Sequence, residues 1–247
     1  MIRMNNKIQK SVFSQYFKTI KHGTILILLF LNYGGFCQSR WELQNDGSTR
    51  WNIKTDIPHY DHIEMSGETV STVLRYGVNK DGSFSLERSL IWPMLRTIPN
   101  NTHASLMQRY AIDFASLLTV NGQTLKTEKV KNISLNGIFT VVSEYSVPSK
   151  IELTRQIFNS TTKPMLCERY TVKNNSEKPV NVIVPEQKTI YHTDSAKGVE
   201  GSYTIETGIQ KSGFYNLKPG QQIQFDTYFQ AWSHKQTASE VDRKSVV

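Results

Sequence analysis

Residues 69–92 read TVSTVLRYGVNKDGSFSLERSLIW, two extended runs rich in apolar and β-branched residues on either side of Asp81-Gly82. An Asp-Gly or Asn-Gly dipeptide between extended runs is a strong hairpin signal, because both central residues of a type I′ turn need positive φ. We therefore expect two antiparallel strands, Thr69–Val78 and Phe84–Trp92, joined by a tight turn.

The hairpin signal recurs at Asn121-Gly122 and at Asn136-Gly137. Extended runs flank these turns over residues 117–120, 123–130, 133–135 and 138–147. Alternation of apolar and polar residues predicts further strands over 151–158, 168–173, 180–184, 203–209 and 223–232. No window shows a helical period over three turns. About ten to thirteen strands, each burying one face, predict an all-β fold, an antiparallel two-sheet β-sandwich.

Two stretches do not fit the strand pattern. They are Pro58–Gly67 (PHYDHIEMSG) and Pro93–Leu106 (PMLRTIPNNTHASL), the second with two prolines and two adjacent asparagines. We expect both to be irregular segments, and long irregular segments on a sandwich are where contacts with partners or ligands usually lie.

The first 37 residues have the pattern of a secretory signal peptide. Five basic residues and no acid precede the apolar run Thr24–Leu31, which is too short to span a bilayer core of about 30 Å. Small residues at Gly35 and Cys37 predict cleavage after Cys37, which leaves a β-sandwich domain over 38–232 and a polar tail or linker over 233–247. Acylation of Cys37, as in a lipoprotein, and an uncleaved anchor are the alternatives. We expect an exported chain, in the periplasm, at the cell surface or secreted.

Composition and charge exclude several classes of function. The chain is 38% hydrophobic and 11% aromatic, which is too apolar for a disordered protein. Removing five cations from a formal charge of +8 leaves +3, so no basic stripe remains for nucleic acid. Cys167 would then be the only cysteine, and we interpret it as a small buried hydrophobe.

No motif predicts catalysis, a metal or a cofactor. In residues 59–64 (HYDHIE), the two histidines of an extended segment point apart, so we favour loop hydrogen bonds over metal binding, with partner or glycan contact as an alternative. A glycosidase needs two carboxyl groups roughly 5–9.5 Å apart, and nothing pairs any two of the acids over residues 61–87, which we take as solvated. A Gly-x-Ser-x-Gly elbow and a P-loop are absent, and a thiol nucleophile at Cys167 with His103 or His192 is disfavoured within a strand.

Candidate contact residues lie in the two irregular stretches. Trp92 opens the longer one, and planar hydrogen-bonding groups follow it at Arg96, Asn100, Asn101 and His103. A flat aromatic ring beside such groups suits a carbohydrate, and it suits a buried domain interface equally well. We add two residues of the other stretch, Asp61 and His62. Other aromatic residues that could stack on a sugar or pack in a core are Tyr110, Tyr191, Tyr215 and Trp232.

Three stretches carry a resemblance to a known family, DHIEMSG (61–67), WPMLRTIPN (92–100) and ERYTVKN (168–174). Together they resemble the N-terminal β-sandwich, or supersandwich, of secreted bacterial six-hairpin glycosidases, over about residues 40–232. The resemblance implies a parent enzyme that acts on a polysaccharide or oligosaccharide. It also implies that the catalytic acids lie in an (α/α)6 barrel, which this chain does not include, so no catalytic residue is carried over.

Three hypotheses for function follow. The first is the non-catalytic β-sandwich portion of an exported glycoside hydrolase, which covers one side of the helical barrel and lends the segment 93–106 to the rim of the active site. The second is a free-standing exported glycan-binding module that uses Trp92. The third is a complete small enzyme on a sandwich, for example a lyase or an epimerase-like protein, and no spacing of titratable residues favours it.

Overall fold

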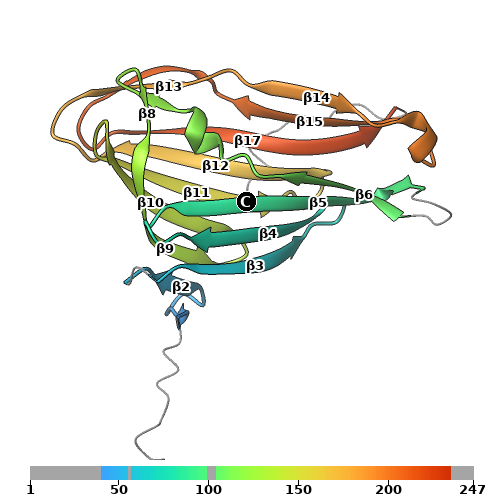
Figure 1. Ribbon diagram of the computed structural model, residues 1–247, viewed down its shortest axis with the longest axis horizontal. Helices are drawn as coiled ribbons and strands as arrows, with labels where there is room; N and C mark the ends of the chain where they lie inside the picture. Colours follow the sequence, from blue (N-terminus) through green and yellow to red (C-terminus); the bar gives the residue numbers. More distant parts are fainter. Residues whose placement is uncertain (1–39, 55–56, 99–103, 235–247) are drawn as a thin grey trace, which may run out of the picture. The chain divides into compact units, whose positions relative to one another are not determined.

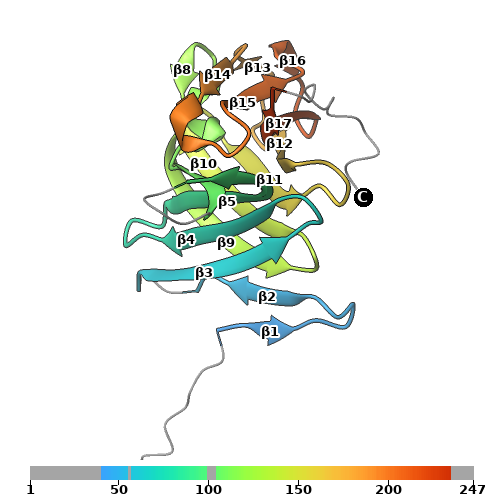
Figure 2. The same ribbon diagram turned by 90° about the vertical axis from the view of Figure 1, so that its right-hand side faces the viewer.

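The computed structural model describes residues 40–54, 57–98 and 104–234, which form β-strands and two short 3-10 turns (Figures 1 and 2). The fold class predicted from the sequence is confirmed. The predicted signal peptide (1–37), the three candidates Asn100, Asn101 and His103, and the predicted tail beyond His234 lie outside the described residues. Within the described ranges, no helix has both the length and the apolar character needed to cross a bilayer.

A nine-stranded antiparallel sheet forms one layer of the sandwich. Its strands, in spatial order, are β1 (Glu42–Leu43), β2 (Thr49–Asn52), β9 (Lys126–Leu135), β10 (Phe139–Val147), β11 (Ile151–Asn159), β12 (Met165–Asn174), β17 (Gln222–Ser233), β15 (Tyr203–Gln210) and β14 (Lys188–His192).

Two four-stranded antiparallel sheets pack against it. One has the order β3 (His59–Ser66), β4 (Ser71–Val78), β5 (Phe84–Thr97) and β6 (Ala104–Tyr110), and the other has the order β16 (Gly213–Leu217), β13 (Val180–Val184), β7 (Thr119–Val120) and β8 (Gln123–Thr124). The 3-10 turns η1 (Phe114–Leu117) and η2 (Ser195–Lys197) lie in the connections before β7 and β15.

One hydrophobic core lies between the layers and includes residues from all three sheets. On strand β4, Tyr76 packs on Phe139 of β10 with ring centroids 4.7 Å apart, and Leu74 is fully buried two residues before it. The third sheet adds aliphatic side chains to the same cluster, for example Val120 and Val182. Strands such as β4, β11 and β13 alternate buried and less buried residues, so burying one face of each accounts for the two-layer arrangement.

The three predicted hairpins are confirmed, but their turns differ in type. Asn121-Gly122 has φ of 50° and 78°, the pair of positive values that a type I′ turn needs. Gly82 and Gly137 have φ of 83° and 68°, while the residue before each keeps a negative φ. These two hairpins have longer loops, because their last strand pairs are Val78 with Phe84 and Leu135 with Phe139.

The two stretches predicted to be irregular are largely strands, so that prediction was wrong. Within Pro58–Gly67, residues 59–66 form β3, an edge strand whose mostly exposed side chains give no apolar alternation. Within Pro93–Leu106, β5 continues to Thr97 and β6 begins at Ala104. Pro93 lies at a shift of register between Trp92 and Arg96, where an interrupted ladder tolerates a residue without an N–H.

Replacing a core aromatic should measure how much this packing stabilises the fold. Phe139→Ala removes a fully buried ring, so we expect the free energy of unfolding in urea to fall by about 3–5 kcal/mol. Phe214→Ala removes a largely exposed ring of β16 and should change it by less than about 0.5 kcal/mol. Equal effects of the two variants would contradict the location of the core.

Candidate functional site

The far end of β5 and the segment after η2 are joined by backbone hydrogen bonds. Strand β5 extends beyond its last pair with β4, at Ile91, and beyond this point it pairs with β6. The Ile98 N–H donates to the Lys197 carbonyl at 2.8 Å, and the Val199 N–H donates to the Arg96 carbonyl at 2.9 Å. These bonds join the end of β5 to the connection between β14 and β15 at one end of the sandwich, on the right in Figure 1.

The side chains at this junction form an exposed, mixed surface, which we call the β5 tip surface. It consists of Met94, Arg96, Ile98, Lys197 and Val199, all exposed. Because Arg96 and Ile98 are two residues apart in an extended strand, and their backbone partners are Val199 and Lys197, these four side chains share a face. Three apolar side chains beside two cations are therefore exposed at the end of the sandwich.

Trp92, the first sequence candidate, is fully buried in the core. Its indole Nε1 donates to the Pro164 carbonyl at 2.9 Å, which satisfies its one polar atom. A ring without exposed surface has no face to stack on a sugar. Of the two interpretations of Trp92, packing is therefore the one that its surroundings fit. Arg96, the next candidate, lies in the β5 tip surface with an exposed side chain.

Asp61 and His62 lie on the edge strand β3, beside a shallow hollow of about 430 Å³. Asp61 Oδ1 accepts from the His62 N–H at 2.8 Å, and its Oδ2 lies 3.7 Å from His59 Nε2. Asp61 pairs with Tyr76 of β4, and Tyr76 pairs in turn with Leu86 of β5. Leu86 lies six residues before Trp92, a distance of about 20 Å along the strand. The structure does not bring the two groups of candidates together.

No metal centre is formed within the described ranges. In residues 40–54, 57–98 and 104–234, no group of three or more histidines, cysteines or acids is placed to hold a metal ion.

Cys167 is buried on β12, and burial raises the pKa of its thiol to about 12. A thiol with so high a pKa is protonated at neutral pH and is a poor nucleophile.

A buried ion pair joins the two layers. Arg88 of β5 and Glu168 of β12 are both fully buried, and the guanidinium binds the carboxylate through Nε and through Nη2, the latter at 2.8 Å. Arg88 also donates to the Ile112 carbonyl. Glu168 Oε2 accepts from the Tyr170 hydroxyl at 3.0 Å and from Thr227 at 3.3 Å. The pair is therefore hydrogen-bonded on both sides, as a buried pair must be.

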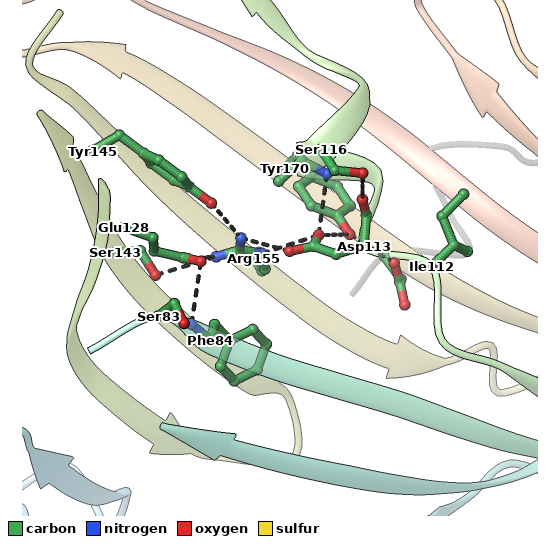
Figure 3. A network of polar contacts seen from close by, with 12 residues as sticks. Ser83, Phe84, Ile112, Asp113, Ser116, Glu128, Ser143, Tyr145, Arg155 and Tyr170 are labelled. Atoms are coloured by element: carbon green, nitrogen blue, oxygen red, sulfur yellow. Dashed lines mark hydrogen bonds and ion pairs between the residues drawn. The ribbon is translucent and has the colours of Figure 1, made fainter. Parts of the chain in front are cut away.

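A second buried arginine extends the network (Figure 3). Arg155 of β11 donates from Nη2 to Asp113 at 2.7 Å and from Nη1 to Glu128 at 2.9 Å. Its remaining bonds go to Ser143 at 3.2 Å, to the Tyr145 hydroxyl at 2.8 Å and, from Nε, to Asp113 Oδ1 at 3.3 Å. Asp113 also caps η1 by accepting from the Ala115 N–H, and it lies 3.3 Å from the Tyr170 hydroxyl, which links the two arginines.

The electrostatics of the network hold its charges fixed. Burial by itself would raise the pKa of Asp113, but the Arg155 guanidinium beside it lowers that pKa below the ordinary value. Burial would lower the pKa of Arg88, yet Glu168 raises it overall. A glycosidase acid must be protonated at working pH. Asp113 is ionised and bound to Arg155, so it suits a structural role and not acid catalysis.

A cavity of about 710 Å³ opens beside Asp113, Glu128 and Tyr145. Thr127 borders it with φ of 60°, an uncommon conformation for a β-branched residue. The Lys126 and Lys129 side chains also line this cavity. Asp113 and Glu128 are bound by Arg155, and the third acid of the lining, Asp81, accepts from the Ser83 N–H and hydroxyl. The cavity therefore offers no free acid pair for chemistry.

Sequence reasoning missed this network, although a signal was present. Ile151, Leu153 and Ile157 were placed on one face of a strand, and Arg155 falls in the same phase. Arg88 likewise stands between Leu86 and Leu90 in the alternation of β5. A charge in the inward phase of an apolar strand indicates a buried pair, since an isolated buried charge is prohibitively costly.

Comparison with solved structures gives distant neighbours of this chain, whereas the sequence comparisons give none. The sequence matches no protein-family model and no curated protein. A solved structure described as "Putative kojibiose phosphorylase from human microbiome" aligns with 74% of this chain at 9% identity and a TM-score of 0.30. The aligned part is 26% of that protein, so the chain corresponds to about a quarter of its length.

Breaking the buried ion pair should be far more costly than breaking an exposed one. Glu168→Gln leaves the Arg88 charge buried and uncompensated, so we expect urea unfolding to show a loss of about 3–5 kcal/mol. Glu87→Gln breaks the exposed pair with Arg75 and should cost less than about 1 kcal/mol. A loss at Glu168 no larger than that at Glu87 would contradict the role of the pair.

The lowered pKa of Asp113 predicts a pH-dependent stability. The folded state favours ionised Asp113, so its contribution is complete above the unfolded pKa of about 3.9 and is lost as pH falls through the lower folded value. The stability difference between the wild type and Asp113→Asn should therefore be largest at neutral pH and should shrink below about pH 4. Urea unfolding at pH 7, 5, 4 and 3 tests this, and a constant difference would refute it.

Proposed function

We propose that this chain is the non-catalytic β-sandwich portion of an exported glycoside hydrolase, and that it packs on a separate helical catalytic domain. The observation that carries the proposal is the β5 tip surface, where Met94 and Ile98 at the end of β5 and Val199 on the segment bonded to it are all exposed. Contiguous exposed apolar groups on a stable domain mark a surface that a partner covers. The glycosidase-like stretch 92–100 contains two of these three residues.

The ion pairs of the buried acids in the described residues support a non-catalytic role for this chain. A retaining or inverting glycosidase needs one carboxyl group that is protonated and one that is ionised. Asp113, Glu128 and Glu168 are bound to buried arginines. These acids stabilise the domain, and the acid and base would belong to the catalytic domain.

The carbohydrate and the compartment belong to the same proposal. The parent enzyme would act on a polysaccharide or oligosaccharide in the periplasm, at the cell surface or outside the cell. The basic and apolar pattern of residues 1–37 supports export, with cleavage after Cys37. This chain would contribute stability and the shape of the cleft rim near Arg96, and it would need no cofactor.

Two equally exposed isoleucines allow a matched test of docking. Ile98 in the β5 tip surface is 39% exposed, and Ile183 of β13 is 42% exposed. The test uses a parent protein that contains both the sandwich and the helical catalytic domain, with the two domains produced as separate chains. Ile98→Asp should weaken the association of the two domains about tenfold or more, because a charge would be buried in the apolar contact. Ile183→Asp should leave the affinity unchanged in calorimetric titration. Equal affinities for the two variants, or no association of the wild type, would refute docking through this surface.

A further inference from the structure

A groove lies between the free edges of two sheets. The strand β6 is the edge of its four-stranded sheet, and β14 is the edge of the nine-stranded sheet. Between them lies a groove of about 340 Å³, within the usual range of ligand sites. Its lining is Gln108, Tyr110, Thr189, Tyr191, Ile205 and Thr207.

The lining is polar at positions where a sandwich normally buries apolar side chains. Thr207 is in the phase of Ile205, which is buried, and Thr189 pairs with Thr207 across the ladder. On β6, Gln108 is in the phase of the buried Leu106. If this edge of the sandwich served only to close the core, its inward-facing residues would be aliphatic. Hydroxyl and amide groups there instead suit a polar ligand.

Several of these polar groups are free to bond with a ligand. Across the described part of the chain, the Gln108 amide and the hydroxyls of Tyr110, Tyr191 and Thr207 have no hydrogen-bond partner, whereas Thr189 accepts from Gln187 at 3.1 Å. They supply both donors and acceptors around one hollow. No lining residue is charged, so the groove has no group that would select a phosphate, a sulfate or a carboxylate.

The two tyrosines differ in how firmly they are held. The Tyr110 ring packs on Phe229 with centroids 4.7 Å apart, and Phe229 in turn packs on Phe114 at 5.7 Å. Burial raises the pKa of Tyr110 to about 12, which keeps its hydroxyl protonated as a donor. Tyr191 is 56% exposed, so its ring is available at the mouth of the groove.

We propose that the groove between β6 and β14 binds a neutral oligosaccharide, with Tyr191 stacking on a sugar ring and Gln108, Tyr110 and Thr207 bonding to its hydroxyl groups. A pyranose ring has an apolar C–H face and an equatorial rim of hydroxyls, which matches an aromatic face beside uncharged donors and acceptors. The proposal goes beyond a supporting role in a glycosidase, because it needs this chain alone and uses residues outside the β5 tip surface.

The test is calorimetric titration of the full chain with maltohexaose, cellohexaose, xylohexaose and mannohexaose. We expect one or more of these to bind, and Tyr191→Ala to weaken that binding about tenfold through loss of stacking. Tyr110→Phe keeps the ring on Phe229 and removes only its hydroxyl, so it should weaken binding about threefold. Ile190→Ala is the matched control, because Ile190 is the neighbouring residue of β14 and is 51% exposed.

Three results would overturn the proposal. They are no binding of any of the four oligosaccharides, binding that Tyr191→Ala leaves unchanged, and an equal loss in Ile190→Ala. Self-association of the chain that Tyr191→Ala abolishes, without sugar binding, would assign the groove to a second copy adding a strand at the open edges. The docking variant Ile98→Asp should bind sugar like the wild type, so failure of docking and failure of the groove are separate outcomes.

Discussion

The ion pair between Arg88 and Glu168 is the contact on which the rest of the sandwich depends. It links β5 of a four-stranded sheet to β12, near the middle of the nine-stranded sheet, and neither side chain is exposed to water. An unpaired buried charge costs several kcal/mol, so the layers pack stably only in the register that brings these two groups together. The bonds of Arg155 to Asp113 and Glu128 fix the η1 connection and β9 in the same way.

The position of the proposed surfaces follows from this constraint. Because β5 is fixed at Arg88, its last residues extend beyond β4 and meet the segment after η2, which exposes the β5 tip surface. The Arg88 guanidinium also lies 5.2 Å from the centroid of the Phe229 ring, and that ring supports Tyr110 in the groove. One buried pair thus positions both the proposed docking surface and the proposed sugar site, although the two use different residues.

Sequence reasoning predicted what is local and missed what is distant. The hairpins could be predicted because Asp-Gly and Asn-Gly determine a turn with their own backbone. Strand β3 could not, since an edge strand with few buried side chains has no alternation to detect. The charged network was missed because Arg88 and Glu168 are eighty residues apart, and pairing at that separation depends on how the sheets pack. Tyr110 and Tyr191 were recognised as possible stacking residues, but only the fold brings them into one groove.

The central claim is that this sandwich belongs to a larger carbohydrate-active enzyme, and the coding sequence tests it most directly. Reading the frame and its neighbouring genes past the codon for Val247 should reveal several hundred residues of paired helices, in the same frame or in an adjoining gene. A stop codon with no such coding region beside it would contradict the claim. The chain would then act without a barrel, and the groove between β6 and β14 would be the place to look for its function.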